Sequence, residues 1–298
     1  MGHGQTKLIL KGHPWVLAIF AGLLKNEAIK AFALSILSLL LPAWMHAQRA
    51  EIGLQLGGSH FWGDVGPYGL NLPQGYQGGL FFRYNIDKHW AVRIGGNYAE
   101  LNVKDANAQL DYRRNRNLSF RTDIWEGYLT MEFNYFEFKP GTPQWHTPYL
   151  LGGIGAFGFN PEARYRGTWY ELQPLGTEGQ GTPASEKAPY ALASGFVMFG
   201  MGYKFALSRH VTLGLEMTFR NVQTDYLDDV SGQYVAPAVL AEERGLVAAA
   251  LSDRSRSPGD KSLTYRGNPA NDDWYIFSAV TLQIRFERFY EKCATFVR

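Results

Sequence analysis

The feature that most constrains this chain is a repeated alternation of apolar and polar residues. It is clearest near 120–137, where Trp125 and Leu129 alternate with Glu126 and Thr130. Successive side chains of a β-strand point to opposite faces, so this alternation predicts strands with one apolar and one polar face. The expected strands lie near 51–62, 76–85, 89–101, 120–137, 147–159, 190–206, 210–222 and 273–287. The glycine-rich stretches 147–159 and 190–206 leave their facing open.

The connections between the expected strands alternate in length. Short links of turn-forming residues lie at 86–88, 139–143 and 207–209, and longer links lie at 63–75, 102–119, 160–189 and 223–272. Bacterial outer-membrane barrels connect their strands in this way, with short periplasmic turns and long extracellular loops. An even number of strands places both ends of the mature chain in the periplasm.

Composition agrees with strands rather than with helices in a membrane. The mean hydropathy is −0.22 and aromatic residues make up 15% of the chain, which suits strand surfaces and the aromatic girdles of barrels. We therefore predict an all-β fold, a transmembrane antiparallel up-and-down β-barrel of about eight strands, OmpA-like in size. A soluble lipocalin-like barrel is the alternative, because periodicity does not reveal which face points inward.

The polar faces of the expected strands carry charges of both signs. On a lipid-facing surface an arginine would cost roughly 2–4 kcal/mol, whereas opposite charges can pair inside a barrel. An eight-stranded barrel has an interior that side chains just fill. We therefore predict a filled interior rather than a pore, with a lumen charge network of Glu51, Arg83, Arg93, Glu126, Glu132, Glu216, Arg220 and Arg285.

The N-terminal region has the pattern of an export signal. Apolar runs at 14–24 and 31–43 are both short for a membrane span, and the second follows Lys25 and Lys30 and leads to Ala47. A charged region, an apolar region and a small residue at the cut describe a secretory signal. We assign 1–47 to a leader and 48–298 to the barrel domain; two short anchor helices are the alternative.

Catalytic and metal-binding patterns are sparse in the sequence. Near the expected outer rim, His60 follows Ser59 and precedes Asp64, but neighbouring residues of a strand point to opposite faces. The one cysteine, Cys293, cannot form an internal disulfide. The formal net charge of +2 does not suggest a nucleic-acid partner. We expect neither an enzyme nor a cofactor.

The two longest loops contain less ordinary strings. One is Leu-Gln-Pro-Leu-Gly-Thr-Glu-Gly-Gln-Gly at 172–181, and the other is Thr-Asp-Tyr-Leu-Asp-Asp-Val-Ser at 224–231. The acids of the second string could bind Ca²⁺, although solvated turn carboxylates are the simpler interpretation. We expect a helical stretch near 236–251 and a mobile polar stretch from 252 to 273.

These strings resemble the PorG-like outer-membrane barrels of Bacteroidota, and Gly63-Asp64 and Arg83-Tyr-Asn85 are similar too. The similarity covers roughly 50–288. It implies an association with type IX secretion and gliding motility, and a periplasmic ring made of a lipoprotein and its partner. It implies no catalytic residue. The loop residues that carry the similarity are Asn160, Pro161, Gln173, Pro174, Gly176, Glu178, Gly181, Asp225, Tyr226, Asp228 and Asp229.

From these features we expect a non-enzymatic component of the bacterial outer membrane. Its role would be to anchor or organise the periplasmic ring of a type IX secretion system, with outer-membrane lipid and the ring proteins as partners. A small passive porin or an adhesin-type barrel is the alternative.

Overall fold

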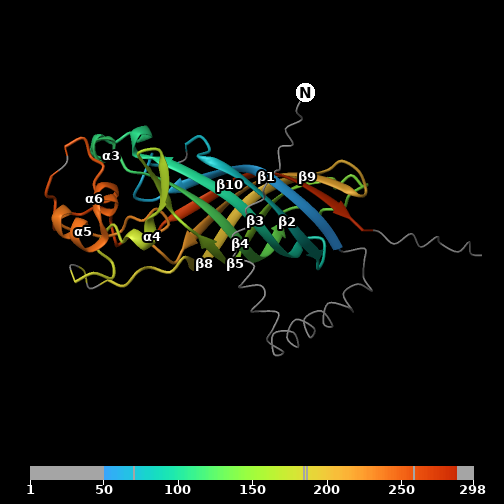
Figure 1. Cartoon of the computed structure of the whole chain (residues 1–298). Coiled ribbons are helices and arrows are strands. Elements are labelled where there is room, and N and C mark those ends of the chain that lie inside the picture. Colours follow the sequence, from blue (N-terminus) through green and yellow to red (C-terminus); the bar gives the residue numbers. More distant parts are fainter. Residues whose placement is uncertain (1–49, 70, 184, 186, 258, 287–298) are drawn as a thin grey trace, which may run out of the picture. The chain divides into compact units, whose positions relative to one another are not determined.

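Eight long strands of the described residues form a closed antiparallel barrel (Figure 1). The computed structural model describes residues 50–69, 71–183, 185, 187–257 and 259–286. The barrel strands are β1 (Ala50–Trp62), β2 (Gly75–Asn85), β3 (Trp90–Lys104), β4 (Ser119–Asn134), β5 (His146–Phe159), β8 (Ala193–Ala206), β9 (Val211–Val222) and β10 (Trp274–Arg285).

Each of these strands pairs with its neighbours in the chain, and β1 pairs with β10 to close the ring. The expected up-and-down topology is therefore confirmed. The proposed leader, Cys293 and the tail after Phe286 lie outside the described residues.

Connections at the two ends of the barrel differ in length, as the sequence predicts. One end has the links 86–89, 135–145 and 207–210, and the other has 63–74, 105–118, 160–192 and 223–273. The first and last strands start and finish at the short-link end, where the Phe286 amide donates to the Ala50 carbonyl at 3.1 Å.

The long loops contain more structure than the sequence indicates. The expected helical stretch is confirmed as α5 (Pro237–Arg244) and α6 (Leu246–Ser252). The sequence did not predict η2 (Asp105–Asn107), α3 (Asp111–Arg116), α4 (Leu172–Leu175) or the hairpin of β6 (Glu162–Tyr165) and β7 (Thr168–Glu171). Among the described residues, no helix is long and apolar enough to cross a membrane.

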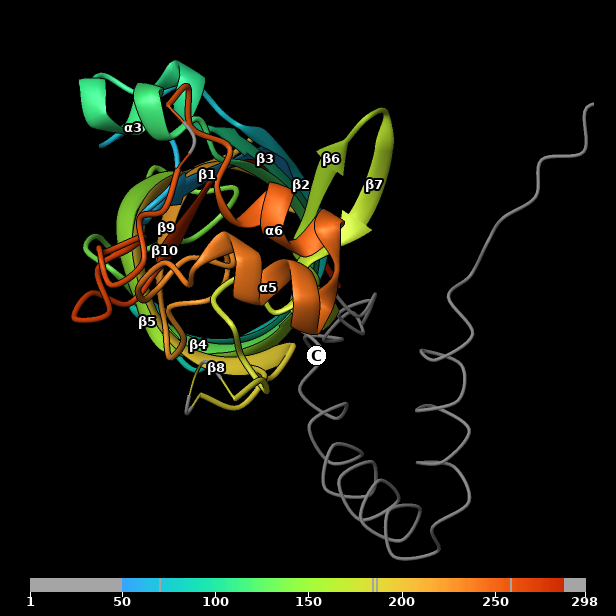
Figure 2. The same ribbon diagram turned by 60° about the vertical axis from the view of Figure 1, so that its left-hand side comes forward.

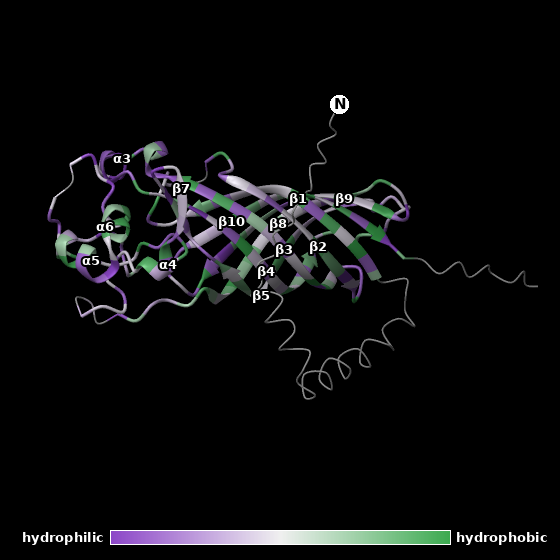
Figure 3. Ribbon diagram, viewed as in Figure 1, coloured by the Kyte–Doolittle hydropathy of each residue, from purple (hydrophilic) through white to green (hydrophobic). Residues whose placement is uncertain are grey.

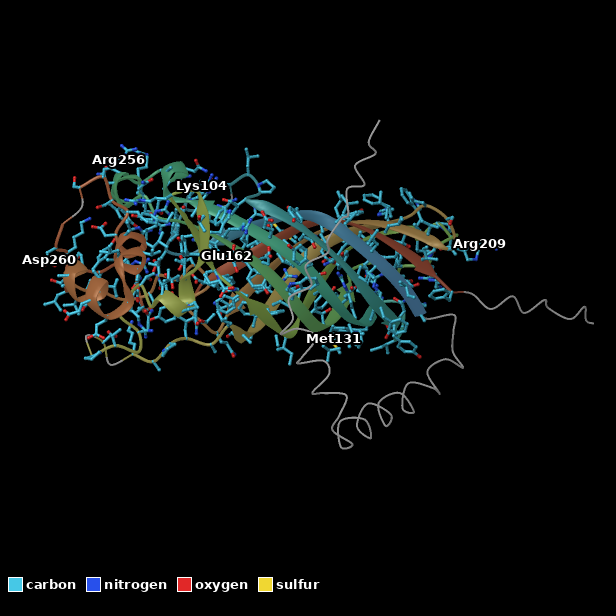
Figure 4. All side chains as sticks on the ribbon, viewed as in Figure 1. Lys104, Met131, Glu162, Arg209, Arg256 and Asp260 are labelled. Carbon is cyan, nitrogen blue, oxygen red and sulfur yellow. The ribbon has the colours of Figure 1, made fainter. Side chains whose placement is uncertain are left out.

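The outer face of the barrel is apolar, so the barrel is not of the lipocalin type. Hydrophobic and hydrophilic residues alternate along the strands in Figure 3, and Met131 projects outward from the wall in Figure 4. The alternation resolves the facing of both glycine-rich strands, since Leu150 and Ile154 of β5 and Phe199 of β8 are exposed. Exposed apolar residues of this belt include Ile52, Leu54, Leu56, Leu80, Ile94, Leu129, Met131, Val197, Met201, Leu215, Val280, Leu282 and Ile284.

Aromatic side chains lie on the outer face at both ends of the belt. Tyr98 packs on Trp125 with ring centres 4.6 Å apart toward the long loops, and Trp90 packs on Phe133 at 4.8 Å toward the short links. Girdles of this kind mark the two interfaces of a membrane. The outer surface is thus built to lie in lipid.

Candidate functional site: the charged lumen and the loop cap

The interior of the barrel is filled by paired charges. Glu132 lies 3.1 Å from Arg83, 3.2 Å from Arg93 and 2.7 Å from the Lys204 ammonium. Arg93 also contacts Glu216 at 2.6 Å. All these side chains are almost completely buried, so each charge depends on the others in place of water.

The rest of the predicted network lies in the same interior. Glu51 bonds Arg83 at 2.8 Å and Arg285 at 2.6 Å, linking the first, second and last strands. Glu126 bonds Arg220 at 2.8 Å and accepts from the Tyr275 hydroxyl at 2.6 Å. The eight charged residues predicted from strand faces therefore all pair with one another in this interior.

Lys204 belongs to this charge network, but the sequence did not reveal it, because the glycines of its strand hid the alternation.

Toward the long loops the interior becomes aromatic, with ring centres 5.6 Å apart for Phe157 and Tyr275 and 5.1 Å apart for Phe61 and Phe120. The lumen is thus occupied along its length.

The four long loops fold together into a cap over one end of the barrel. Figure 2 shows α5 and α6 lying across the barrel opening. Arg116 joins three loops, since its guanidinium donates to Asp105 at 2.8 Å, to the Asp64 carbonyl at 2.6 Å and to the Arg266 carbonyl at 2.7 Å.

The two loop strings that carry the family resemblance interlock within this cap. Glu178 of the first string accepts from the backbone amides of Ser231 and Gly232, both at 2.9 Å, in the second string and the residue after it. The first string can make this turn because Gly176 and Gly179 adopt positive φ angles of 57° and 76°, which glycine tolerates best.

Asp229 of the second string also holds the two loops together. It accepts from the hydroxyls of Thr177 and, at 2.8 Å, Tyr190, and it lies 3.6 Å from Arg266. Arg266 also reaches Glu178 at 3.4 Å. Burial raises the pKa of Asp229 to about 6, against the opposing influence of Arg266.

Four aspartates lie next to these contacts: Asp64, Asp225, Asp228 and Asp273. Asp228 accepts from the Val65 and Val230 amides at 3.0 and 2.9 Å. Burial, followed by the charge of the neighbouring acids, raises the pKa of Asp228 and Asp273. Burial also raises the pKa of Asp225 to about 7.

The expectation of solvated carboxylates is therefore wrong for Asp228 and Asp229, which are both buried. The sequence places these acids in a polar loop, and only the folded cap encloses them. Among the described residues, no three side chains of the metal-ligating types come together as a metal site.

The remaining residues of the strings have structural positions in the cap. The Pro161 carbonyl accepts from the Leu172 amide at 2.8 Å, and the Gln173 side chain donates to the Tyr190 carbonyl at 3.0 Å. Tyr226 stacks on Tyr190 with ring centres 4.6 Å apart. The backbone amide of Asn160 donates to the Thr122 hydroxyl at 3.1 Å. Pro174 and Gly181 are exposed.

The cap residues that the sequence did not single out are Arg116, Tyr190, Arg266 and Asp273. Arg266 lies within the stretch expected to be mobile and Asp273 ends it, yet both are buried. No local pattern could have found them, because each has a partner far away in the chain: Asp64 for Arg116, Asp229 for Tyr190, Glu178 for Arg266 and Leu227 for Asp273.

His60 and Ser59 do not form a catalytic pair. His60 contacts Ser278 and the Asn71 carbonyl, both at 3.0 Å, while Ser59 bonds the Glu100 carbonyl. The strand thus separates them as expected.

An apolar outer belt, a filled polar interior and a structured loop cap define a transmembrane β-barrel of the outer-membrane class. The chain belongs to the family described as a domain of unknown function (DUF6089), whose model matches residues 30–237. A comparison with curated proteins found no match.

Among solved structures, the chain is similar to Neisserial surface protein A, with 8% identity and a TM-score of 0.38 over 80% of this chain and 97% of that one. It is also similar to Ail of Yersinia pestis, with 9% identity and a TM-score of 0.38 over 80% and 99%. A third is OprG of Pseudomonas aeruginosa, with 10% identity and a TM-score of 0.37 over 81% and 98%. Because these sequence identities and TM-scores are low, the barrel fold is concluded from the strand pairing of this chain and not from the comparisons.

Proposed function

We propose that this protein is a structural, non-enzymatic component of a type IX secretion system in the bacterial outer membrane, where it anchors or organises a periplasmic ring. The observation that carries the proposal is the interlocking of the two strings that resemble PorG-like barrels. Glu178 and Asp229, one from each string, meet at the same buried Arg266. The two strings thus form one structural unit within the cap.

The filled lumen favours a structural role over passive diffusion. Arg83, Arg93 and Lys204 are among the most deeply buried large side chains of the described barrel, and they are held by the carboxylates of Glu51, Glu132 and Glu216. Opening a channel would require these pairs to separate. We expect no ion conductance in planar bilayers, and steady single-channel currents would favour the porin alternative.

The orientation follows from the two unequal ends of the barrel. In outer-membrane barrels short turns face the periplasm and long loops face outward, so in this proposal the cap lies outside the cell, and the start of β1 and the end of β10 lie on the periplasmic side. A periplasmic ring would then contact the short-link end. Its exposed cations include Lys88, Lys139 and Arg209, the last of which is labelled at this end in Figure 4.

The test is a pull-down from detergent-solubilised outer membranes with a Lys88→Glu/Lys139→Glu/Arg209→Glu variant. The control reverses Arg256 and Lys261 in the cap, and all proteins are compared at equal outer-membrane abundance. We expect the turn variant to lose ring components and the cap variant to retain them. Retention by the turn variant, or release by the cap variant, would contradict this placement.

An adhesin-type role is favoured by one observation. The cap exposes large apolar side chains to solvent, with Leu246 79%, Leu263 81% and Tyr265 71% exposed. Cells that display a Leu246→Ser/Leu263→Ser/Tyr265→Ser variant would then adhere to host or abiotic surfaces less than the wild type does. Unchanged adhesion together with intact ring association would contradict the adhesin role and support the secretion role.

A further inference from the structure

Four aspartates of the cap gather where three neighbouring barrel strands meet the long loops. Asp64 follows the end of β1, Asp225 and Asp228 follow the end of β9, and Asp273 directly precedes β10. These strands are neighbours in the sheet in the order β1, β10, β9. The fold therefore brings carboxylates from distant parts of the chain to the same edge of the barrel.

The four carboxylates lie close enough to repel one another. Asp273 is repelled by Asp228, Asp225 and Asp64. Asp228 is repelled by Asp64 and Asp225, and Asp225 by Asp64. Both Asp228 and Asp273 are buried, and buried charges in proteins are paired or coordinate a metal ion, because an unpaired charge is costly to remove from water.

The arginines of the cap do not provide the opposite charge. Within the described part of the chain, none of the four carboxylates forms an ion pair. Arg116 pairs with Asp105 instead, at 2.8 Å, and the Arg113 guanidinium donates to the Gly66 carbonyl at 2.9 Å. Both arginines act on Asp64 only from beyond ion-pair distance. A net negative charge therefore remains where the four aspartates meet.

Two of the aspartates present oxygens that no hydrogen-bond donor reaches. Asp273 is 1% exposed, and its Oδ2 accepts from the Leu227 amide at 3.1 Å, whereas its Oδ1 has no partner. Both side-chain oxygens of Asp225 also have no partner, although Ser231 lies nearby. Buried polar atoms are almost always bonded, so unpartnered carboxylate oxygens indicate a water or an ion.

The backbone next to Asp273 Oδ1 is fitted closely around it. A Cβ atom on Gly63 would lie 2.1 Å from this oxygen and 2.3 Å from the Phe61 ring. Gly63 directly precedes Asp64, so the free oxygen of Asp273 lies against the segment that carries another of the four carboxylates. It is thus directed into the group and not away from it.

We propose that Asp225 and Asp273 bind a calcium ion at this edge of the barrel, with Asp64 and Asp228 adding negative charge around it. Carboxylates are hard ligands, and Ca²⁺ also accepts backbone carbonyls and water in irregular shells, whereas Mg²⁺ requires near-ideal octahedral geometry. Among the described residues, no three metal-ligating side chains converge. Two carboxylates therefore hold the ion, and carbonyls or water complete its shell.

The ion joins the first long loop to both ends of the last one, where the barrel closes. The expected affinity rests on the outer-membrane orientation given above, which exposes the cap to the outside, but the proposal does not depend on a role in secretion. Calcium sites of extracellular modules have Kd values of roughly 10⁻⁴–10⁻³ M.

The experiment measures amide hydrogen exchange of the detergent-purified full-length protein at pH 8, after removal of metal ions with a chelator. Amides of 224–232 are followed with Ca²⁺, with Mg²⁺ and with neither. Asp225→Asn/Asp273→Asn removes both ligand charges and keeps the shape of the side chains. The control, Asp260→Asn, removes an exposed carboxylate of the same loop.

We expect Ca²⁺ at ten times its Kd to slow the exchange of these amides in the wild type about tenfold, because an ion that binds only the closed cap stabilises it by the factor 1 + [Ca²⁺]/Kd. The Asp260→Asn control should respond like the wild type, and the double variant should not respond. Without Ca²⁺ the double variant should be protected at least as well as the wild type, since it removes repulsion.

Exchange that Ca²⁺ leaves unchanged in the wild type would overturn the proposal. A response of the double variant equal to that of the wild type would place the ion elsewhere, and equal protection by Mg²⁺ would overturn the choice of calcium. If the double variant does not fold, Asp225→Asn alone replaces it, because Asp225 is only partly buried. An undiminished Ca²⁺ response of that variant would again refute the site.

Discussion

Replacing Glu132 with glutamine removes one charge at the centre of the lumen. The substitution keeps the shape of the side chain but leaves three cations around a neutral amide. Arg83 and Arg93 retain Glu51 and Glu216 as partners, whereas Lys204 loses the carboxylate that holds it at 2.7 Å. Breaking a buried pair on one side costs roughly 3–5 kcal/mol, because a charge remains buried without compensation.

The assay is urea unfolding of the barrel in lipid bilayers, followed by the difference in gel mobility between folded and unfolded protein. We expect Glu132→Gln to lower the free energy of unfolding by about 3–5 kcal/mol. The control, Glu137→Gln, removes an exposed carboxylate that pairs with Lys88 and should leave the transition unchanged.

A second substitution separates loss of charge balance from loss of packing. In the Glu132→Gln background, Lys204→Met removes the uncompensated ammonium and should restore part of the lost stability. If Glu132→Gln unfolds like wild type, or if Lys204→Met makes it worse, the lumen is not held by charge pairing.

Three further predictions concern the belt and the cap. Leu215→Arg on the lipid-facing belt should lower the free energy of unfolding in the bilayer by roughly 2–4 kcal/mol, measured by the same unfolding assay. Leu207→Arg in an exposed turn should not lower it, and equal effects of the two variants would mean that the assigned facing of β9 is wrong. Arg266→Met should loosen the cap by roughly 3 kcal/mol, because it leaves Asp229 buried without a cation and Glu178 with only Lys187 at 3.8 Å. Faster protease cleavage within 224–252 with an intact barrel checks this, and unchanged cleavage contradicts it. The pKa of Asp225 is raised to about 7 and that of Asp229 to about 6 from an ordinary 3.8, so the folded cap holds protons that the unfolded chain releases. Cap stability should therefore fall as pH rises from about 4 to 7, and amides of 224–232, corrected for intrinsic rates, should exchange faster at pH 8 than at pH 5; a flat profile would refute the enclosure of these acids.

The barrel could be predicted from sequence because its information is local. Alternation along one strand, such as Leu129, Thr130, Met131 and Glu132, already separates lipid from lumen. Where glycines interrupt the alternation, as at Gly200 and Gly202, the signal is lost, and Lys204 could not be assigned to the interior.

The cap could not be predicted because its contacts join distant loops. Arg266 and Glu178 are 88 residues apart in the chain, and neither has a local pattern that names the other. The β6–β7 hairpin was missed for another reason, since strands of four residues are too short to show alternation. The strings were visible in the sequence, but their burial was not.

The ion pair between Glu51 and Arg285 can form only when the barrel closes. Glu51 enters with the first strand, but Arg285 arrives with the last, and the two meet at 2.6 Å only once β1 and β10 are joined. An incomplete barrel keeps an open edge and a wet, charged interior. Joining the ends therefore expels water and neutralises charge in a single event, so we expect truncated chains to remain in the periplasm as substrates for degradation instead of lodging in the membrane as partial barrels.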